Sequence, residues 1–171
     1  MNKLLLILLA TCFLVSCNDE KKIEGDMYFK TTFEDILPFN ESNLFVKTEG
    51  HSGMFCGKVD STNIYGIPFK VKLSDVLYKP VTKINFSVWC KFLNNNSSGQ
   101  FVITIMNGTD QLAWKGVGIG EKIKKLNSWE KISGELIIKD KITPETQLII
   151  YVWNTSLQEF YYDDLEVFFE E

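Results

Sequence analysis

The chain has 171 residues, a formal net charge of -4, and 45% hydrophobic residues, of which 13 are phenylalanine. This composition is typical of a globular protein with a dense core and excludes a disordered chain. The sequence has no excess of basic residues, which argues against nucleic acid as a partner.

The first 16 residues have the features of a bacterial secretion signal. Lys3 gives a positive end, and the apolar run Leu4–Leu9 that follows is too short to form a stable membrane-spanning helix. The sequence Leu14-Val15-Ser16-Cys17 resembles the lipobox of bacterial lipoproteins, which implies cleavage before Cys17 and lipidation of that cysteine. Several acyl chains on Cys17 would anchor the protein to a membrane durably. The alternative is an amphipathic N-terminal helix that is buried in the fold.

Residues 17–27 form the lipidated cysteine and a tether that is charged and has no hydrophobic periodicity. The charges after Cys17 are similar to the export tag of lipoproteins on the outer face of some Gram-negative bacteria. We therefore predict a signal peptide over residues 1–16, the tether over 17–27, and one domain over 28–171. The expected location is the outer membrane, at the cell surface.

From residue 28 onward, short segments of alternating hydrophobicity are separated by turn residues, and no long stretch has a helical period. The predicted strands are Tyr28–Phe33, Leu44–Val46, Met54–Val59, Phe69–Leu73, Ile84–Phe92, Gln100–Met106, Trp129–Ile138, Leu148–Trp153 and Tyr161–Phe169. A single helical turn is expected near Ser74–Tyr78. Many short strands with regularly spaced turns predict an all-β protein with two antiparallel sheets packed as a β-sandwich.

The most regular of these segments is Ile84–Phe92. One face of this strand is apolar and is predicted to lie in the core: Ile84, Phe86, Val88, Cys90 and Phe92. The other face carries Trp89 and Lys91 among small polar residues. The sequence therefore predicts either a second packing layer on this face or a surface that receives a ligand.

Five short motifs occur in a characteristic order along the chain. They are Phe33-Glu34, Gly50-His51-Ser52-Gly53, Val88-Trp89-Cys90-Lys91, Ser128-Trp129-Glu130-Lys131-Ile132 and Tyr162-Asp163-Asp164-Leu165-Glu166-Val167. Together they resemble the galactose-binding-like jelly-roll domains, which include many carbohydrate-binding modules of secreted bacterial glycan-degrading systems. The resemblance implies a jelly-roll topology. Structural and adhesive modules share this fold, so the fold alone does not define the function.

Two cysteines remain once Cys12 has left with the signal peptide and Cys17 carries lipid. Export through an oxidising compartment allows a disulfide between Cys56 and Cys90. Two buried thiols fit the sequence equally, because it does not show whether the two Cα atoms approach within about 7 Å. The chain has no Cys-x-x-Cys pair of the kind that binds zinc.

The only histidine, His51, precedes Ser52 in a sequence that partly matches a nucleophile elbow. The motif requires glycine two residues after the serine, and Met54 stands there instead, so we expect a turn histidine that caps backbone groups.

Four carboxylates lie near the ends of the chain: Glu34, Asp35, Asp163 and Asp164. Their role has three interpretations. First and last strands are often neighbours, so these side chains could meet as a glycosidase acid/base pair, as calcium ligands, or as caps of strand ends. The jelly-roll resemblance points to Glu34 and Asp163 as ligands of a structural calcium ion.

Aromatic side chains give the strongest indication of function. In Leu148–Trp153, Tyr151 and Trp153 share the face opposite the predicted core residues. If this strand lies near Ile84–Phe92, then Trp89, Lys91, Tyr151 and Trp153 line one surface that suits a sugar, with rings for its C–H face and polar groups for its hydroxyls. Trp114 and Trp129 are expected to pack.

The sequence thus predicts a non-catalytic, lipid-anchored glycan-binding protein of the cell envelope, whose expected partners are a polysaccharide and the membrane. The alternative is a structural or adhesive module that binds a partner protein in an envelope assembly.

Overall fold

The structure is a computed structural model that describes residues 27–34, 44–75, 81–139, 143 and 145–170. The predicted signal peptide, Cys17, nearly all of the tether and Asp35 lie outside these ranges. In the described part of the chain, no helix is long and apolar enough to cross a membrane.

Strands make up most of the described residues, together with one short 3-10 helix, η1 (Leu73–Asp75). The strands are β1 (Met27–Thr31), β2 (Phe45–Lys47), β3 (Phe55–Val59), β4 (Phe69–Lys72), β5 (Lys83–Phe92), β6 (Gly99–Asn107), β7 (Asp110–Gly118), β8 (Glu130–Ile137), β9 (Thr146–Asn154) and β10 (Phe160–Glu170).

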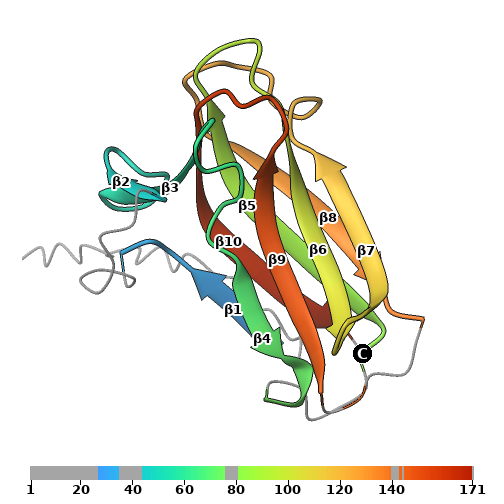
Figure 1. The fold of residues 1–171 in the computed structure, drawn as a ribbon. Helices are drawn as coiled ribbons and strands as arrows, with labels where there is room; N and C mark the ends of the chain where they lie inside the picture. The colour runs from blue at the N-terminus through green and yellow to red at the C-terminus, as the bar shows by residue number, and fades with distance from the viewer. Residues whose placement is uncertain (1–26, 35–43, 76–80, 140–142, 144, 171) are drawn as a thin grey trace, which may run out of the picture.

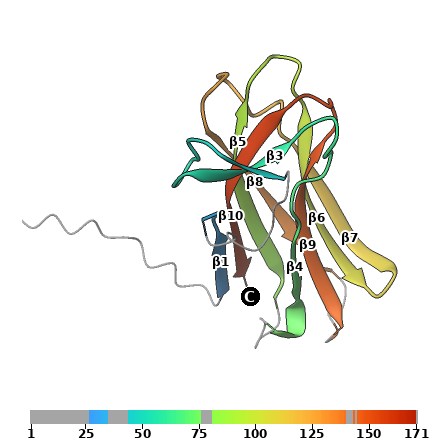
Figure 2. The same cartoon turned by 60° about the vertical axis from the view of Figure 1, so that its left-hand side comes forward.

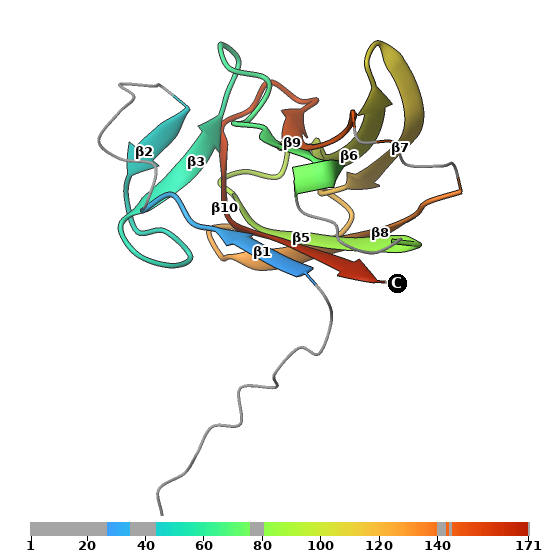
Figure 3. The same ribbon diagram turned by 90° about the horizontal axis from the view of Figure 1, so that it is seen from below.

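The strands are arranged in two antiparallel sheets that face each other (Figures 1 and 3). The six-stranded sheet has the order β2-β3-β10-β5-β8, and β1 pairs with the second half of β10, beyond the end of β3. The four-stranded sheet has the order β4-β9-β6-β7. The β2–β3 pair extends to one side of the sandwich (Figure 2). The predicted all-β sandwich with jelly-roll topology is confirmed.

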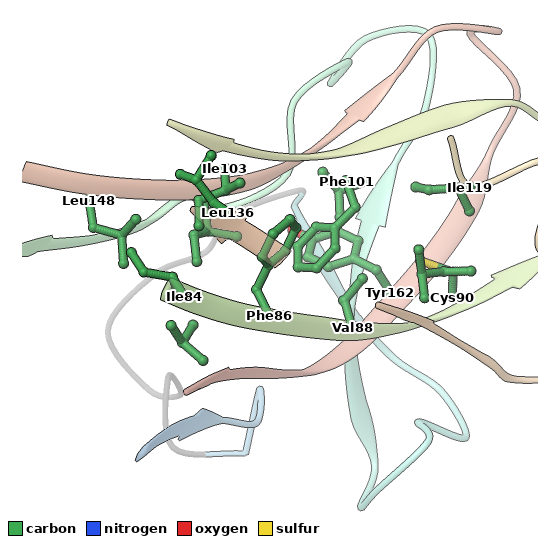
Figure 4. Close-up of a cluster of buried hydrophobic side chains, with 14 of the residues drawn as sticks. Ile84, Phe86, Val88, Cys90, Phe101, Ile103, Ile119, Leu136, Leu148 and Tyr162 are labelled. Carbon is green, nitrogen blue, oxygen red and sulfur yellow. The ribbon is translucent and has the colours of Figure 1, made fainter. Parts of the chain in front are cut away.

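The core lies between the sheets and is built by the alternation seen in the sequence. Side chains of β5 point toward those of β6 and β9 in Figure 4, and the rings of Phe86 and Phe101 lie 5.0 Å apart. Every predicted core residue of Ile84–Phe92 is buried, and so are Leu148, Ile150 and Val152 of β9. Burial of these apolar surfaces is the main stabilising contribution to the fold.

One strand, β7, was not predicted. It forms a hairpin with β6 through the turn at Gly108, which has a positive φ of 61°. β7 is an edge strand whose side chains are exposed or half-buried, and Gly116 and Gly118 remove side chains from one of its faces. Its sequence therefore lacks the alternation that marks the other strands.

Cys56 and Cys90 are both buried free thiols, which decides between the two alternatives left by the sequence. Strand β10 lies between β3 and β5, so the two cysteines are on strands separated by about 10 Å, too far for a disulfide. Burial, with a smaller effect of Asp163, raises the pKa of Cys56 to about 12.

Candidate functional site

A β-bulge in β10 brings two neighbouring carboxylates to one place. Asp163 pairs with Trp89 and Glu166 pairs with Ser87. Two residues of β10, Asp164 and Leu165, therefore lie opposite one residue of β5, Val88. Asp164 has a φ of 46°, a left-handed conformation that aspartate tolerates better than most residues. Both aspartates are buried, at 0% and 1% exposed.

Asp163 and Glu34 hold the segment Gly50–Phe55 from two sides. Asp163 Oδ2 accepts hydrogen bonds from the backbone N–H groups of His51 (2.8 Å) and Ser52 (3.1 Å). Glu34 Oε1 accepts from the N–H groups of Met54 and Phe55, both at 2.8 Å. These carboxylates therefore satisfy four backbone donors, three in the turn and one at Phe55, the first residue of β3.

These contacts match the capping role that was one of the three interpretations of the carboxylates. Calcium requires six to eight oxygen ligands, whereas the oxygens of Glu34 and Asp163 that are engaged here face N–H donors. Among the described residues, no group of three or more His, Cys, Asp and Glu side chains is placed to hold a metal ion. The described side chains alone do not make up a calcium site, and calcium binding by Glu34 and Asp163 stays a prediction.

Asp164 binds the two residues that suggested a hydrolase. His51 Nδ1 lies 2.6 Å from Asp164 Oδ2, and the Ser52 hydroxyl donates to Asp164 Oδ1 at 2.7 Å. Serine and histidine thus share one carboxylate instead of forming a relay in which histidine takes the serine proton. The arrangement fixes the loop and does not activate a nucleophile.

The two aspartates have opposite shifts of pKa. Burial raises the pKa of Asp163, and its hydrogen bonds from backbone N–H groups offset only part of that effect. Burial also acts to raise the pKa of Asp164, but hydrogen bonds from His51 and Ser52, with the charge of Lys30, lower it overall. Both groups are enclosed under the loop, so neither can work as a glycosidase acid or base in an open cleft.

The outer face of the six-stranded sheet carries a histidine cluster, which we define as His51, Trp89, Lys91, Trp129 and Tyr161. The His51 ring stacks on Trp89 with centroids 3.8 Å apart and an interplanar angle of 13°. The Lys91 ammonium lies 4.6 Å from the Trp129 ring centroid and donates to the Glu49 carbonyl oxygen at 3.2 Å. Residues of the loop therefore cover one ring face of Trp89 and accept a hydrogen bond from the Lys91 ammonium.

The expectation that Trp89 and Lys91 share one surface with Tyr151 and Trp153 is wrong. β5 belongs to the six-stranded sheet and β9 to the four-stranded sheet, and the core separates their outer faces. Alternation places both pairs of residues away from the core, but on opposite sides of the sandwich.

On the four-stranded sheet, Tyr151 and Trp153 are joined by an aromatic residue from the segment before β4. Tyr65 forms an isolated antiparallel bridge with Trp153, and their rings lie 6.2 Å apart at 29°. Tyr65 also meets Tyr151 edge-on at 5.8 Å and is 50% exposed. The three rings form a continuous aromatic surface that is open to solvent at Tyr65.

The same surface continues across β6 to β7. Gln100 lies between Trp153 on β9 and Gly118 on β7. A side chain at Gly116 would collide with the Gln100 amide and the Trp114 ring, so both of these groups lie over Gly116. Trp114 is 46% exposed, so the expectation that it packs is wrong.

We call the residues Tyr65, Gln100, Trp114, Tyr151 and Trp153 the aromatic face. It combines flat apolar rings with an amide that can both donate and accept hydrogen bonds, which is the chemistry that recognises a sugar ring. Sequence reasoning found Tyr151 and Trp153 but not the other members. Tyr65 lies outside any regular strand, and Trp114 lies on the strand that was missed.

Comparison with known proteins agrees with this architecture. No family model and no curated protein matches the sequence. Among solved structures, the CBM22-2 xylan-binding domain of Paenibacillus barcinonensis Xyn10C is similar with a TM-score of 0.55 and 16% identity, over 82% of this chain and 98% of that one. The C-terminal family 22 carbohydrate binding module of Clostridium thermocellum Xyn10B gives a TM-score of 0.54 and 16% identity, over 84% of this chain and 93% of that one. The chain therefore has the jelly-roll β-sandwich fold of carbohydrate-binding modules.

Proposed function

We propose that the protein is a non-catalytic glycan-binding protein that holds a polysaccharide on the aromatic face of its four-stranded sheet. The observation that carries the proposal is the group of adjoining rings formed by Tyr65, Tyr151 and Trp153, with Trp114 on the same sheet face. The xylan-binding domain that shares the fold supports a polysaccharide as the class of ligand.

The expected affinity is weak. Covering roughly 50 Å² of sugar C–H surface on one ring contributes about 1.3 kcal/mol at 25 cal/mol per Å². Several rings and a few hydrogen bonds are needed to reach even millimolar to micromolar affinity. The aromatic face provides several rings side by side, which favours an extended polysaccharide over a single sugar.

The contacts of the carboxylates support a role in binding alone. Asp163 and Asp164 are buried and hydrogen-bonded to the loop that contains His51, and Glu34 binds two backbone N–H groups of the same loop. Each of these groups has a structural task, and none lies on the aromatic face.

The test is binding of the soluble domain, from Asp19 onward, to a panel that includes xylan, galactan and microbial polysaccharides. In native gels that contain each polysaccharide, we expect at least one to slow migration of the domain. If none does, the glycan function is contradicted, and the alternative gains support: a structural or adhesive module that binds a partner protein in an envelope assembly.

The proposal includes attachment to the outer membrane of a Gram-negative bacterium through lipid on Cys17. We expect Cys17→Ala to move the full-length protein from the membrane pellet to the soluble fraction, because the acyl chains supply the membrane affinity. Cys12→Ala is the matched control, since it changes a cysteine of the signal peptide and leaves the lipidation site intact. A Cys17→Ala variant that stays in the pellet after a high-salt wash would exclude the lipid anchor.

A further inference from the structure

A cavity of ≈ 290 Å³ opens beside the aromatic face, and the proposed function does not account for it. It lies where the β4 and β9 side of the four-stranded sheet meets residues of β1 and β10. Its walls are mostly apolar, with Phe33, Ile67, Phe69, Ile150 and Leu165 among the lining residues. A volume near 300 Å³ is at the small end of the range for ligand sites.

The cavity contains few polar groups, and one of them is a buried phenol. The Tyr162 hydroxyl accepts a hydrogen bond from the Ile67 N–H at 2.7 Å. Among the described residues, none accepts a hydrogen bond from the phenol itself, so its proton can be donated to a ligand. Burial raises the pKa of Tyr162, which keeps the hydroxyl protonated at neutral pH.

The cavity and the aromatic face adjoin along the same stretch of chain. Tyr151 belongs to the aromatic face and also lines the cavity. The segment before β4 contributes to both as well, because Tyr65 stacks on Trp153 while Ile67 and Pro68 form part of the cavity wall. A glycan that lies over Tyr65 and Tyr151 would therefore run beside the cavity.

We propose that this cavity receives an aryl ester substituent of the bound glycan, that is, a hydroxylated aromatic acid esterified to a sugar. The inference rests on the proposed function, since the glycan presents the substituent. A further sugar ring does not suit the cavity, because its hydroxyls would lose water against apolar walls. An aromatic ring suits it, because Phe33 and Tyr162, which meet edge-on at 5.3 Å, offer the edges and faces that aromatic pairs prefer. The Tyr162 hydroxyl provides a hydrogen-bond donor for the ester carbonyl or the phenol of the ligand.

The first test uses methyl ferulate as the probe and the ¹⁵N-labelled soluble domain. We expect saturable shifts of the backbone amides of Ile67, Phe69 and Ile150, and no such shifts with xylose. Ile67→Trp fills the cavity and should weaken methyl ferulate binding at least tenfold. Tyr28→Ala should leave it unchanged, because Tyr28 is exposed on β1 and does not line the cavity. An absence of shifts at these amides in the wild-type domain overturns the inference, whether or not Ile67→Trp folds.

The second test compares feruloylated arabinoxylan with the same polymer after alkaline removal of its esters. We expect the wild-type domain to bind the esterified polymer several-fold more tightly, and Ile67→Trp to lose this preference while it still binds the de-esterified polymer. Equal affinity of the wild-type domain for both polymers overturns the inference and leaves the proposed function intact. Binding of methyl ferulate without binding of any polysaccharide overturns the glycan function and supports the aryl ester site.

Discussion

Replacing Asp163 by alanine is expected to lower the free energy of unfolding by about 3–5 kcal/mol, because each buried N–H donor that is left unsatisfied costs about 1–3 kcal/mol. Asp163 is fully buried and accepts hydrogen bonds from the N–H groups of His51 and Ser52. Its removal leaves these donors without an acceptor and releases the loop that covers Trp89. Denaturation in urea, followed by circular dichroism, measures the loss.

Asp60→Ala is the matched control. Asp60 Oδ1 also accepts two backbone N–H groups, those of Thr62 and Asn63, but in a partly exposed turn where water can replace it. We expect a loss of only about 1 kcal/mol there. Equal losses in the two variants would contradict the structural role of Asp163. A rise of the wild-type unfolding midpoint with calcium, absent in Asp163→Ala, would support the predicted calcium site.

Loss of rings from the aromatic face is expected to reduce polysaccharide affinity strongly. Each ring that covers roughly 50 Å² of sugar surface contributes about 1.3 kcal/mol, close to a factor of ten in the dissociation constant. Tyr65→Ala and Trp153→Ala should each weaken binding about tenfold, and the double variant about 100-fold. Isothermal titration with a soluble polysaccharide that the panel identifies measures both effects.

Two variants on the opposite sheet serve as controls for this prediction. Tyr28 is 45% exposed on β1, and Tyr28→Ala should leave polysaccharide affinity unchanged. Trp89→Ala should lower stability through loss of the His51 stack, but the folded fraction should bind normally. A tenfold loss in folded Trp89→Ala, with Trp153→Ala unaffected, would move the site to the histidine cluster.

The sequence predicted the described strands other than β7, because each of these strands packs one face against the core and therefore alternates. Ile84–Phe92 and Leu148–Trp153 match β5 and β9 within two residues at each end. β7 was missed because it is an edge strand with two glycines and little buried surface. Local alternation depends on burial, so a strand without burial carries no such signal.

For the candidate site, the sequence predicted Tyr151 and Trp153 correctly as outward-facing but wrongly grouped them with Trp89 and Lys91. Alternation correctly turned Trp89 and Trp153 away from the core, but it does not specify the sheet to which a strand belongs. That choice depends on long-range pairing, of β5 with β10 and of β9 with β6. Tyr65 joins the aromatic face through a single bridge to Trp153, which no local pattern shows.

The most direct test of the glycan site follows the indole N–H signals of the four tryptophans in an NMR titration with a soluble polysaccharide that the panel identifies. Trp114 and Trp153 belong to the aromatic face, and Trp89 and Trp129 belong to the histidine cluster on the opposite sheet. We predict that the signals of Trp114 and Trp153 shift as the polysaccharide is added, while those of Trp89 and Trp129 stay in place. Shifts of Trp89 and Trp129 alone would contradict the account.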